Sequence, residues 1–135
     1  MISTFEISIS IENAILKTEL ICDNETISIT LRLQNSAPKT YTERNFYKCF
    51  GLLRKDNPHV TFFCKGAKTN VHPSGMSAQM TLGMKAYELE VGKVPSLADL
   101  VFIFDYEDQQ LTNDPAEQSS FYDNWIKSRI GSKHS

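Results

Sequence analysis

The sequence predicts an α+β domain in which an N-terminal antiparallel β-meander is part of a mixed sheet, with two main helices packed on that sheet. Two observations predict this class. Apolar and polar residues alternate over much of residues 5–33, and two later stretches, 42–55 and 114–131, carry apolar residues at helical spacing. A strand with one buried face has a period of two residues and an amphipathic helix a period of 3.6, so the two patterns separate the elements.

Three strands joined by short polar turns account for the first third of the chain. Apolar residues alternate with serine and glutamate over residues 5–11, residues 15–22 supply a returning strand, and alternation resumes over residues 27–33. Residues 12–14 and 23–25 are mostly polar, and Asn and Asp favour turns because their side chains hydrogen-bond the neighbouring backbone. Short turns between successive strands predict an antiparallel meander.

The first predicted helix follows a loop over residues 35–39. Aromatic and aliphatic residues recur at helical spacing from about residue 42 to residue 55. Pro58 ends this helix, because a proline disfavours the helical conformation in the residue before it.

Shorter elements are predicted in the second half of the chain. Residues 59–64 and 84–91 have the composition of strands, and the proline and glycine between them predict a structured loop with one helical turn. Ser96 and Asp99 have the spacing of a capping box and predict a brief helix. Residues 101–104 are apolar throughout, which fits either a strand or the end of that helix.

The last predicted helix has clear end signals. Asp114 suits the N-cap, Pro115 the first helical position and Glu117 the first turn, where a negative charge is favourable. Gly131 is expected to end the helix, because glycine readily adopts the left-handed conformation found there.

Composition restricts the class of protein. With 135 residues, 41% of them hydrophobic and 22% charged, the chain matches one globular domain over residues 1–135, and we expect residues 132–135 to form a disordered tail. No apolar stretch approaches the roughly 20 residues that span a bilayer, and the first residues do not resemble a secretory signal. Cys22, Cys49 and Cys64 are an odd number at wide spacing, which predicts free thiols in a reducing compartment. We expect a cytoplasmic protein without membrane association.

The residues able to do chemistry form no recognisable catalytic or metal motif. Cys64 or Ser74 could act as a nucleophile with His72 and Asp99, but no nucleophile elbow, phosphate loop or paired cysteine spacing surrounds them. Structural zinc needs four ligands, usually in close pairs, whereas the cysteines are scattered and His134 lies in the expected tail. We therefore expect no enzyme activity, no metal and no cofactor.

A basic middle segment supports an alternative hypothesis of single-stranded nucleic-acid binding. From Lys39 to Lys93 the chain has nine basic and four acidic residues. A basic surface with exposed aromatic rings can hold a single strand, but the net charge of -2 argues against a grip by the whole protein. Neighbouring residues of a strand point to opposite faces of the sheet, so either Phe62 or Phe63 must point inward. The aromatic residues interleaved with these charges include Tyr41, Phe46, Tyr47, Phe62 and Phe63.

The following segment is acidic and favours a protein partner. From Val94 to Ile126 there are seven acidic residues and no lysine or arginine. Acids and tyrosines together suit docking against a basic partner, because opposite charges steer association, although polar loops and helix starts also carry acids for solvation alone. The predicted partner-binding residues are Asp105, Tyr106, Glu107, Asp108, Asp114 and Tyr122.

Two parts of the second half carry a family resemblance. The stretch NVHPSGMSAQMTLGMKAYELEVGK with the later DLVFIFD, and then EQSSFYDNWIKS, is similar to small bacterial immunity proteins found beside polymorphic toxins, including those of contact-dependent growth inhibition systems. The resembling region runs from about Phe63 to Ser128 and contains no catalytic motif. The resemblance implies binding and neutralisation of the C-terminal domain of a cognate toxin, which we expect to be a nuclease. A homodimer also remains open if the first strand lies at a sheet edge.

Overall fold

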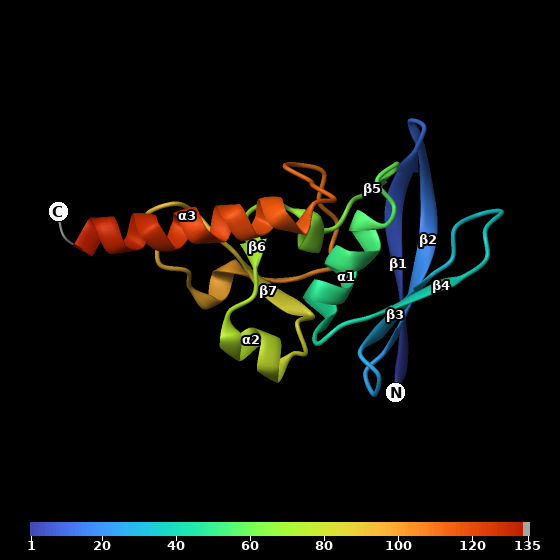
Figure 1. Cartoon of the computed structure of the whole chain (residues 1–135), viewed down its shortest axis with the longest axis horizontal. Coiled ribbons are helices and arrows are strands. Elements are labelled where there is room, and N and C mark those ends of the chain that lie inside the picture. The colour runs from blue at the N-terminus through green and yellow to red at the C-terminus, as the bar shows by residue number, and fades with distance from the viewer. Residues whose placement is uncertain (134–135) are drawn as a thin grey trace.

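The computed structural model describes the backbone of residues 1–133 and the side chains of residues 1–129. Two sheets lie on either side of helix α1 (Phe46–Lys55), with strand orders β4-β3-β2-β1-β5 and β6-β7-β8 (Figure 1). This confirms the predicted α+β class and the N-terminal meander. All strand pairs in the described part of the chain are antiparallel, and they form two sheets where one mixed sheet was expected.

The larger sheet begins with a long hairpin. Strands β1 and β2 pair along their whole length, up to Ile11 opposite Ala14. Glu12 and Asn13 make the turn with positive φ angles of 50° and 67°. Such turns match the right-handed twist of paired strands, so the hairpin closes without a bulge. The strands of this sheet are β1 (Ile2–Ile11), β2 (Ala14–Asp23), β3 (Ser28–Leu31), β4 (Lys39–Thr42) and β5 (Val60–Phe62).

Strand β4 corrects the predicted start of the first helix. The sequence predicts a helix from about residue 42, whereas β4 occupies that position and α1 begins at Phe46. Tyr41 lies opposite Ile29 of β3, and its ring is buried. Asn45 caps α1 by accepting a backbone hydrogen bond from the first turn at 2.8 Å. Strand β4 has a single apolar residue that faces the core, so its sequence lacks the alternation that marks the other strands.

Helix α1 connects the two sheets through its aromatic residues. The ring of Phe50 meets Phe62 of β5 edge-on at 5.7 Å and Phe104, which follows β8, edge-on at 5.2 Å. Edge-to-face contact is a favoured geometry for aromatic pairs. One buried helix face therefore joins both sheets into a shared core.

The smaller sheet and the segments around it consist of short elements. The predicted helical turn is present as α2, the Ser96–Asp99 capping box is formed, and residues 100–102 are a strand, which decides between the two predictions for that region. The predicted strands 59–64 and 84–91 are shorter than expected. The elements are η1 (Lys65–Ala67), β6 (Val71–His72), α2 (Gly75–Met80), β7 (Lys85–Glu88), η2 (Leu97–Asp99) and β8 (Leu100–Phe102).

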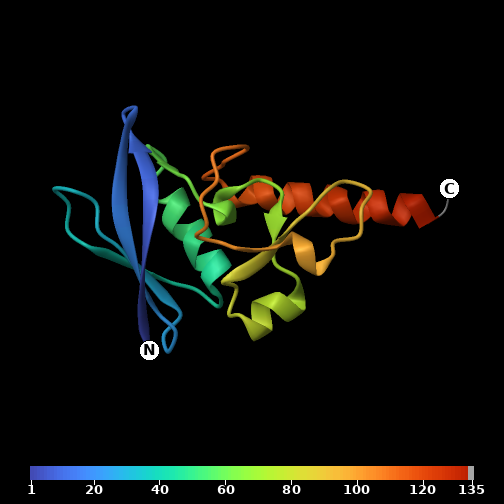
Figure 2. The same cartoon turned by 180° about the vertical axis from the view of Figure 1, so that it is seen from behind.

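The last helix begins as predicted and ends later. Helix α3 (Pro115–Lys133) continues through Gly131, so this glycine does not end it, and the remainder of the expected tail, 134–135, lies outside the described residues. The C-terminal part of α3 extends past the other elements, as the view from behind also shows (Figure 2). Within the described residues, no helix is long and apolar enough to cross a membrane.

Candidate functional site

The acidic segment, residues 105–114, is held against the turn that follows β5. At one end the N–H of Lys65 donates to the carbonyl of Asp105 at 2.8 Å, and at the other the N–H of Thr112 donates to the carbonyl of Ala67 at 2.9 Å. One isolated antiparallel bridge adjoins each of these hydrogen bonds, Cys64 with Tyr106 and Lys68 with Leu111. The segment has little regular secondary structure, yet its backbone is positioned by the fold.

Glu107 is buried, although the sequence predicts it as a partner-binding residue on the surface. Only 8% of the residue is exposed. Its Oε1 accepts hydrogen bonds from the Nζ atoms of Lys68 at 2.9 Å and Lys65 at 3.1 Å, and Glu88 lies within 3.5 Å of both ammonium groups. Two basic residues of the middle segment are thus paired with two acids inside the fold. The carboxylate of Glu107 is occupied by these contacts and is not available to a partner.

The other carboxylate oxygen of Glu107 holds the segment itself. Oε2 accepts the backbone N–H groups of Asp108 and Gln109, each at 3.0 Å. Burial alone would raise the pKa of Glu107, but hydrogen bonds from Lys68, Gln109 and Lys65 outweigh it and lower that pKa to about 2. Glu107 therefore positions its neighbours as a buried, ionised group.

Tyr106 is the most prominent exposed residue of the segment. It is 60% exposed, and its ring stacks on the half-buried Phe63 with centroids 5.8 Å apart and planes 19° apart. Asp105 and Asp108 lie on either side in the chain, and both are exposed. An exposed tyrosine packed on a second ring is of the residue type that is enriched at interface hot spots.

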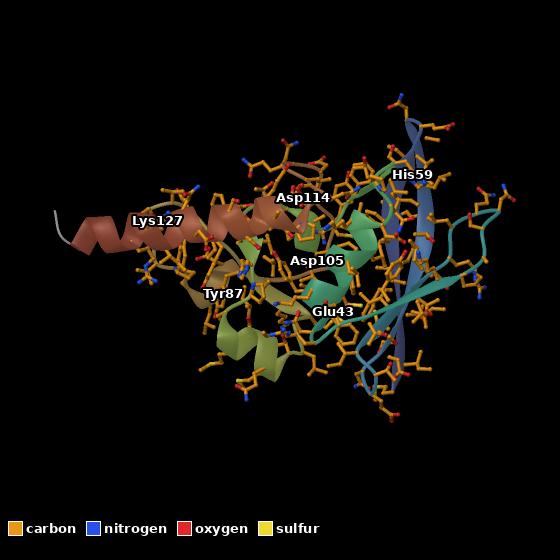
Figure 3. All side chains as sticks on the ribbon, in the orientation of Figure 1. Glu43, His59, Tyr87, Asp105, Asp114 and Lys127 are labelled. Carbon is orange, nitrogen blue, oxygen red and sulfur yellow. The ribbon has the colours of Figure 1, made fainter. Side chains whose placement is uncertain are left out.

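Asp114 marks the other end of the acidic segment and first serves the fold. Its Oδ1 accepts the backbone N–H of Ala116 at 2.9 Å, which caps α3 as predicted. The residue remains exposed, and Figure 3 labels it together with Asp105. A carboxylate fixed by a helix cap can still attract a cation from solvent, because its charge is not paired.

Tyr122 lies apart from the acidic segment, in an aromatic cluster on α3. Its ring stacks on His72 at 4.0 Å, with Trp125 at 5.8 Å on the other side. These three residues line a hollow of about 310 Å³ together with residues of β7 and α2. The structure therefore does not bring Tyr122 together with the other predicted site residues.

Exposed apolar residues near this hollow were not predicted as a surface. Met76 and Met80 of α2 are 70% and 78% exposed, and Val94 and Leu97 are 69% and 80% exposed. Met76 itself lines the hollow and Val94 adjoins Pro95, which lines it too, and exposed apolar groups beside a hollow are typical of contact sites. The sequence signal that could have found this surface is the four-residue spacing of the two methionines in a predicted helical turn.

The candidate catalytic residues all have contacts within the fold. Cys64 is fully buried, and burial raises the pKa of its thiol to about 12, whereas a nucleophilic cysteine needs exposure and a lowered pKa. His72 lies against the carbonyl of Pro73 at 2.9 Å, Ser74 caps α2 and Asp99 caps η2. Within the part of the chain that the structure describes, no cluster of His, Cys, Asp or Glu could hold a metal ion. His134 lies outside that part.

The basic middle segment lacks exposed aromatic rings on which bases could stack. Of the aromatic residues in this segment, Phe63 and Tyr87 are half-buried and the others are buried, and Tyr106 stacks on Phe63. Arg54 is fully buried over the ring of Phe50, at 4.7 Å. Stacking of bases needs accessible rings, so this geometry disfavours the nucleic-acid hypothesis. The five buried rings are Tyr41, Phe46, Tyr47, Phe50 and Phe62.

The candidate contact site is thus the acidic surface, defined as Asp105, Tyr106, Asp108 and Asp114. Three of these residues follow one another closely along a segment that Glu107 holds, and the fourth caps the next helix. No protein-family model matches this chain, and no curated protein sequence matches it significantly.

Proposed function

We propose that this protein is a bacterial immunity protein that binds the C-terminal domain of a cognate toxin in the cytoplasm and neutralises it. The supporting observation is the acidic surface, where exposed Tyr106 rests on Phe63 between Asp105 and Asp108. The proposed target is a nuclease domain, because an enzyme that acts on nucleic acid has a basic binding site that an acidic inhibitor complements.

The way in which the acidic surface is held favours tight binding. A loop that becomes ordered only on binding loses conformational entropy, which weakens the complex. Here Glu107 accepts backbone hydrogen bonds from Asp108 and Gln109, so that cost falls mainly on folding. Asp105 and Asp108 can then steer the partner over a distance, while Tyr106 supplies contact area at short range.

Reversal of the surface charge tests the proposal. The double variant Asp105→Lys with Asp108→Lys is compared with the unaltered protein in binding to the purified C-terminal domain of the cognate toxin. We expect the association rate to fall by about 10-fold or more at low salt, with a smaller difference at high salt. Protection of cells that express the toxin domain should fall in parallel.

A matched control separates position from net charge. The double variant Glu12→Lys with Glu43→Lys changes the net charge equally, through two exposed acids outside the acidic surface. It should keep the association rate within about twofold, because steering depends on where the charge lies. Equal effects of the two variants would remove the acidic surface from the proposal. Salt-sensitive binding of a single-stranded oligonucleotide without binding of the toxin domain would favour the nucleic-acid hypothesis.

A further inference from the structure

The N-terminal half of β1 has no neighbouring strand on the edge that points away from β2. Strand β5 pairs with β1 only from Ile9 to Ile11, and its last contact is the hydrogen bond from Phe63 N–H to the Ser8 carbonyl at 3.0 Å. Among the described residues, no backbone hydrogen bond joins Ile2–Ile7 to a segment on that side. Figure 1 shows the same arrangement, with β5 beside the end of β1 distant from the N-terminus.

The unpaired groups belong to Thr4 and Glu6. The Ser8 carbonyl points toward β5, and backbone groups of a strand alternate in direction, so every second residue points the same way. The N–H and C=O groups of Thr4 and Glu6 therefore point away from β2, and both residues are exposed. They offer two donors and two acceptors in the spacing of a β-ladder.

This edge also lacks the features that block strand addition. Edge strands are commonly protected by lysine, proline or a β-bulge. Residues 2–7 contain no lysine and no proline, and their pairing with β2 runs without interruption from Ile2 opposite Asp23 to Ile7 opposite Thr18. An edge without lysine, proline or a bulge can accept a further strand by backbone pairing.

The charge beside the edge indicates which strand would fit. Glu6 lies directly opposite Glu19 of β2, and both side chains are exposed on the outer face. Their backbone groups do not pair with each other, and in this class of pair the side chains are closer. Like charges placed opposite one another are destabilising, and neither acid forms an ion pair within the described residues. A lysine or arginine beside Glu6 would offset this repulsion.

The face of the sheet that is directed to the core indicates which residue type the added strand should place on that face. A hollow of about 210 Å³ lies against this face, lined in part by Phe5, Phe46, Leu82 and Met84. Residues of an added strand alternate between the two faces of the sheet, so those that face inward would be directed to this apolar side. An inward-facing residue of the added strand should therefore be apolar.

We propose that Ile2–Ile7 of β1 is a docking edge for an extended segment of a partner protein in which basic and apolar residues alternate. The segment extends the larger sheet by pairing with Thr4 and Glu6, places a cation beside Glu6 and directs apolar side chains inward. This edge is separate from the acidic surface and does not depend on it. Only the identification of the partner with the toxin domain rests on the proposed function.

Two synthetic peptides test this proposal without a toxin. The first, acetyl-Thr-Lys-Val-Lys-Val-Lys-Thr-amide, carries the expected alternation, and the second has glutamate in place of each lysine. Each is titrated into the isotopically labelled full chain while amide shifts and hydrogen exchange are recorded. We expect the basic peptide to bind at least about 10-fold more tightly and to slow exchange of the Thr4 and Glu6 amides.

Substitutions locate the binding to this edge. Thr4→Pro removes an N–H group that makes no hydrogen bond to β2, so the basic peptide should bind about 10-fold or more weakly while the other amide shifts are retained. Glu6→Lys should reverse the preference between the two peptides, and it serves if Thr4→Pro disturbs the fold. The matched control is Glu12→Lys, at the opposite end of the hairpin, which should change neither affinity.

Three results would overturn the proposal. The first is equal affinity for the two peptides, and the second is binding of the basic peptide without slower exchange at Thr4 and Glu6. The third is slower exchange at these amides that increases with protein concentration in the absence of peptide, because it would assign the edge to a second copy of this chain. None of these results bears on the charge reversal of the acidic surface, so the two proposals can fail independently.

Discussion

In the larger sheet, the ten-residue strands β1 and β2 pair along their whole length and place Ile7, Ile9, Leu20 and Cys22 in the buried core, whereas no strand of the smaller sheet exceeds four residues. The smaller sheet and the acidic segment depend instead on polar contacts that bridge distant parts of the chain. Lys65 and Lys68 hold Glu107 and Glu88, as described above. Long strands gain stability from the apolar area that they bury, while short ones need specific partners.

A buried polar link likewise attaches α3 to α1 and to the turn around η1. The amide nitrogen of Gln118 donates to the carbonyls of Gly66 at 3.0 Å and Lys68 at 2.9 Å, and its oxygen accepts from Arg54 Nη2 at 2.7 Å. Buried polar groups are costly unless they are hydrogen-bonded, so such contacts specify one arrangement. From this comparison we expect truncation of a core side chain to lower the free energy of unfolding most around the larger sheet. Around the acidic segment, removal of a buried charge should have the larger effect.

The largest expected effect is on the shared core. Phe50→Ala removes the ring that contacts Phe62 and Phe104, and we expect the free energy of unfolding to fall by about 3–5 kcal/mol at every pH at which the protein is folded. Chemical denaturation measures this loss. Leu52→Ala is the matched control on the exposed side of α1, with an expected loss below about 1 kcal/mol. A similar loss for both variants would contradict the assignment of Phe50 to the joint core.

The second effect is smaller and depends on pH. The folded-state pKa of Glu107 is about 2, against an ordinary value of 4.5, so its ionised form stabilises the fold. This contribution is fully present above about pH 4.5 and is lost as pH falls toward 2. The shift corresponds to about 3 kcal/mol. We expect Glu107→Gln to lose a comparable amount at pH 7 and to unfold with a flatter pH dependence between 4.5 and 2.

The matched control for Glu107 is its exposed neighbour. Asp108→Asn should change the free energy of unfolding by less than about 0.5 kcal/mol, because an exposed side chain gains little from folding. Unfolding curves of the three proteins across the acid range give the comparison. If Glu107→Gln retained the pH dependence of the unaltered protein, the stabilising charge would have to lie elsewhere.

The smallest effect on stability should accompany a large effect on binding. Tyr106→Ala removes a ring that is 60% exposed, so we expect a stability loss below about 1 kcal/mol. Binding of the toxin domain should weaken by about 30-fold, the size typical of a hot-spot residue. Tyr106→Phe keeps the stack on Phe63 and should bind within about threefold. Calorimetry of both variants would contradict the proposed function if Tyr106→Ala bound normally.

The sequence predicted the elements whose patterns are local. Alternation predicted β1 and β3, the short turns on either side predicted β2 as the returning strand, and end signals predicted the start of α3 at Asp114 and the capping box at Ser96. It missed β4, because that strand is held by pairing with β3 more than by its own apolar residues. Gly131 failed as an end signal, because α3 continues through it.

The candidate site divides in the same way. The acidic composition and the exposed Tyr106 could be predicted from neighbouring residues alone. Only the tertiary structure separated Glu107, which two lysines about 40 positions earlier draw beneath the surface, from its exposed neighbours. It likewise placed Tyr122 on His72 instead of beside the acids and left the first half of β1 without a neighbour.

The sequence by itself therefore determined the class of fold and the sign of the charge along each segment, because both depend on residues close together in the chain. The tertiary structure decided which of those charges face solvent, because pairing between segments far apart in sequence sets the burial of each group. A carboxylate beside a lysine inside the fold and one in solvent are the same residue in the sequence. Their difference in environment makes one a part of the scaffold and the other available for recognition.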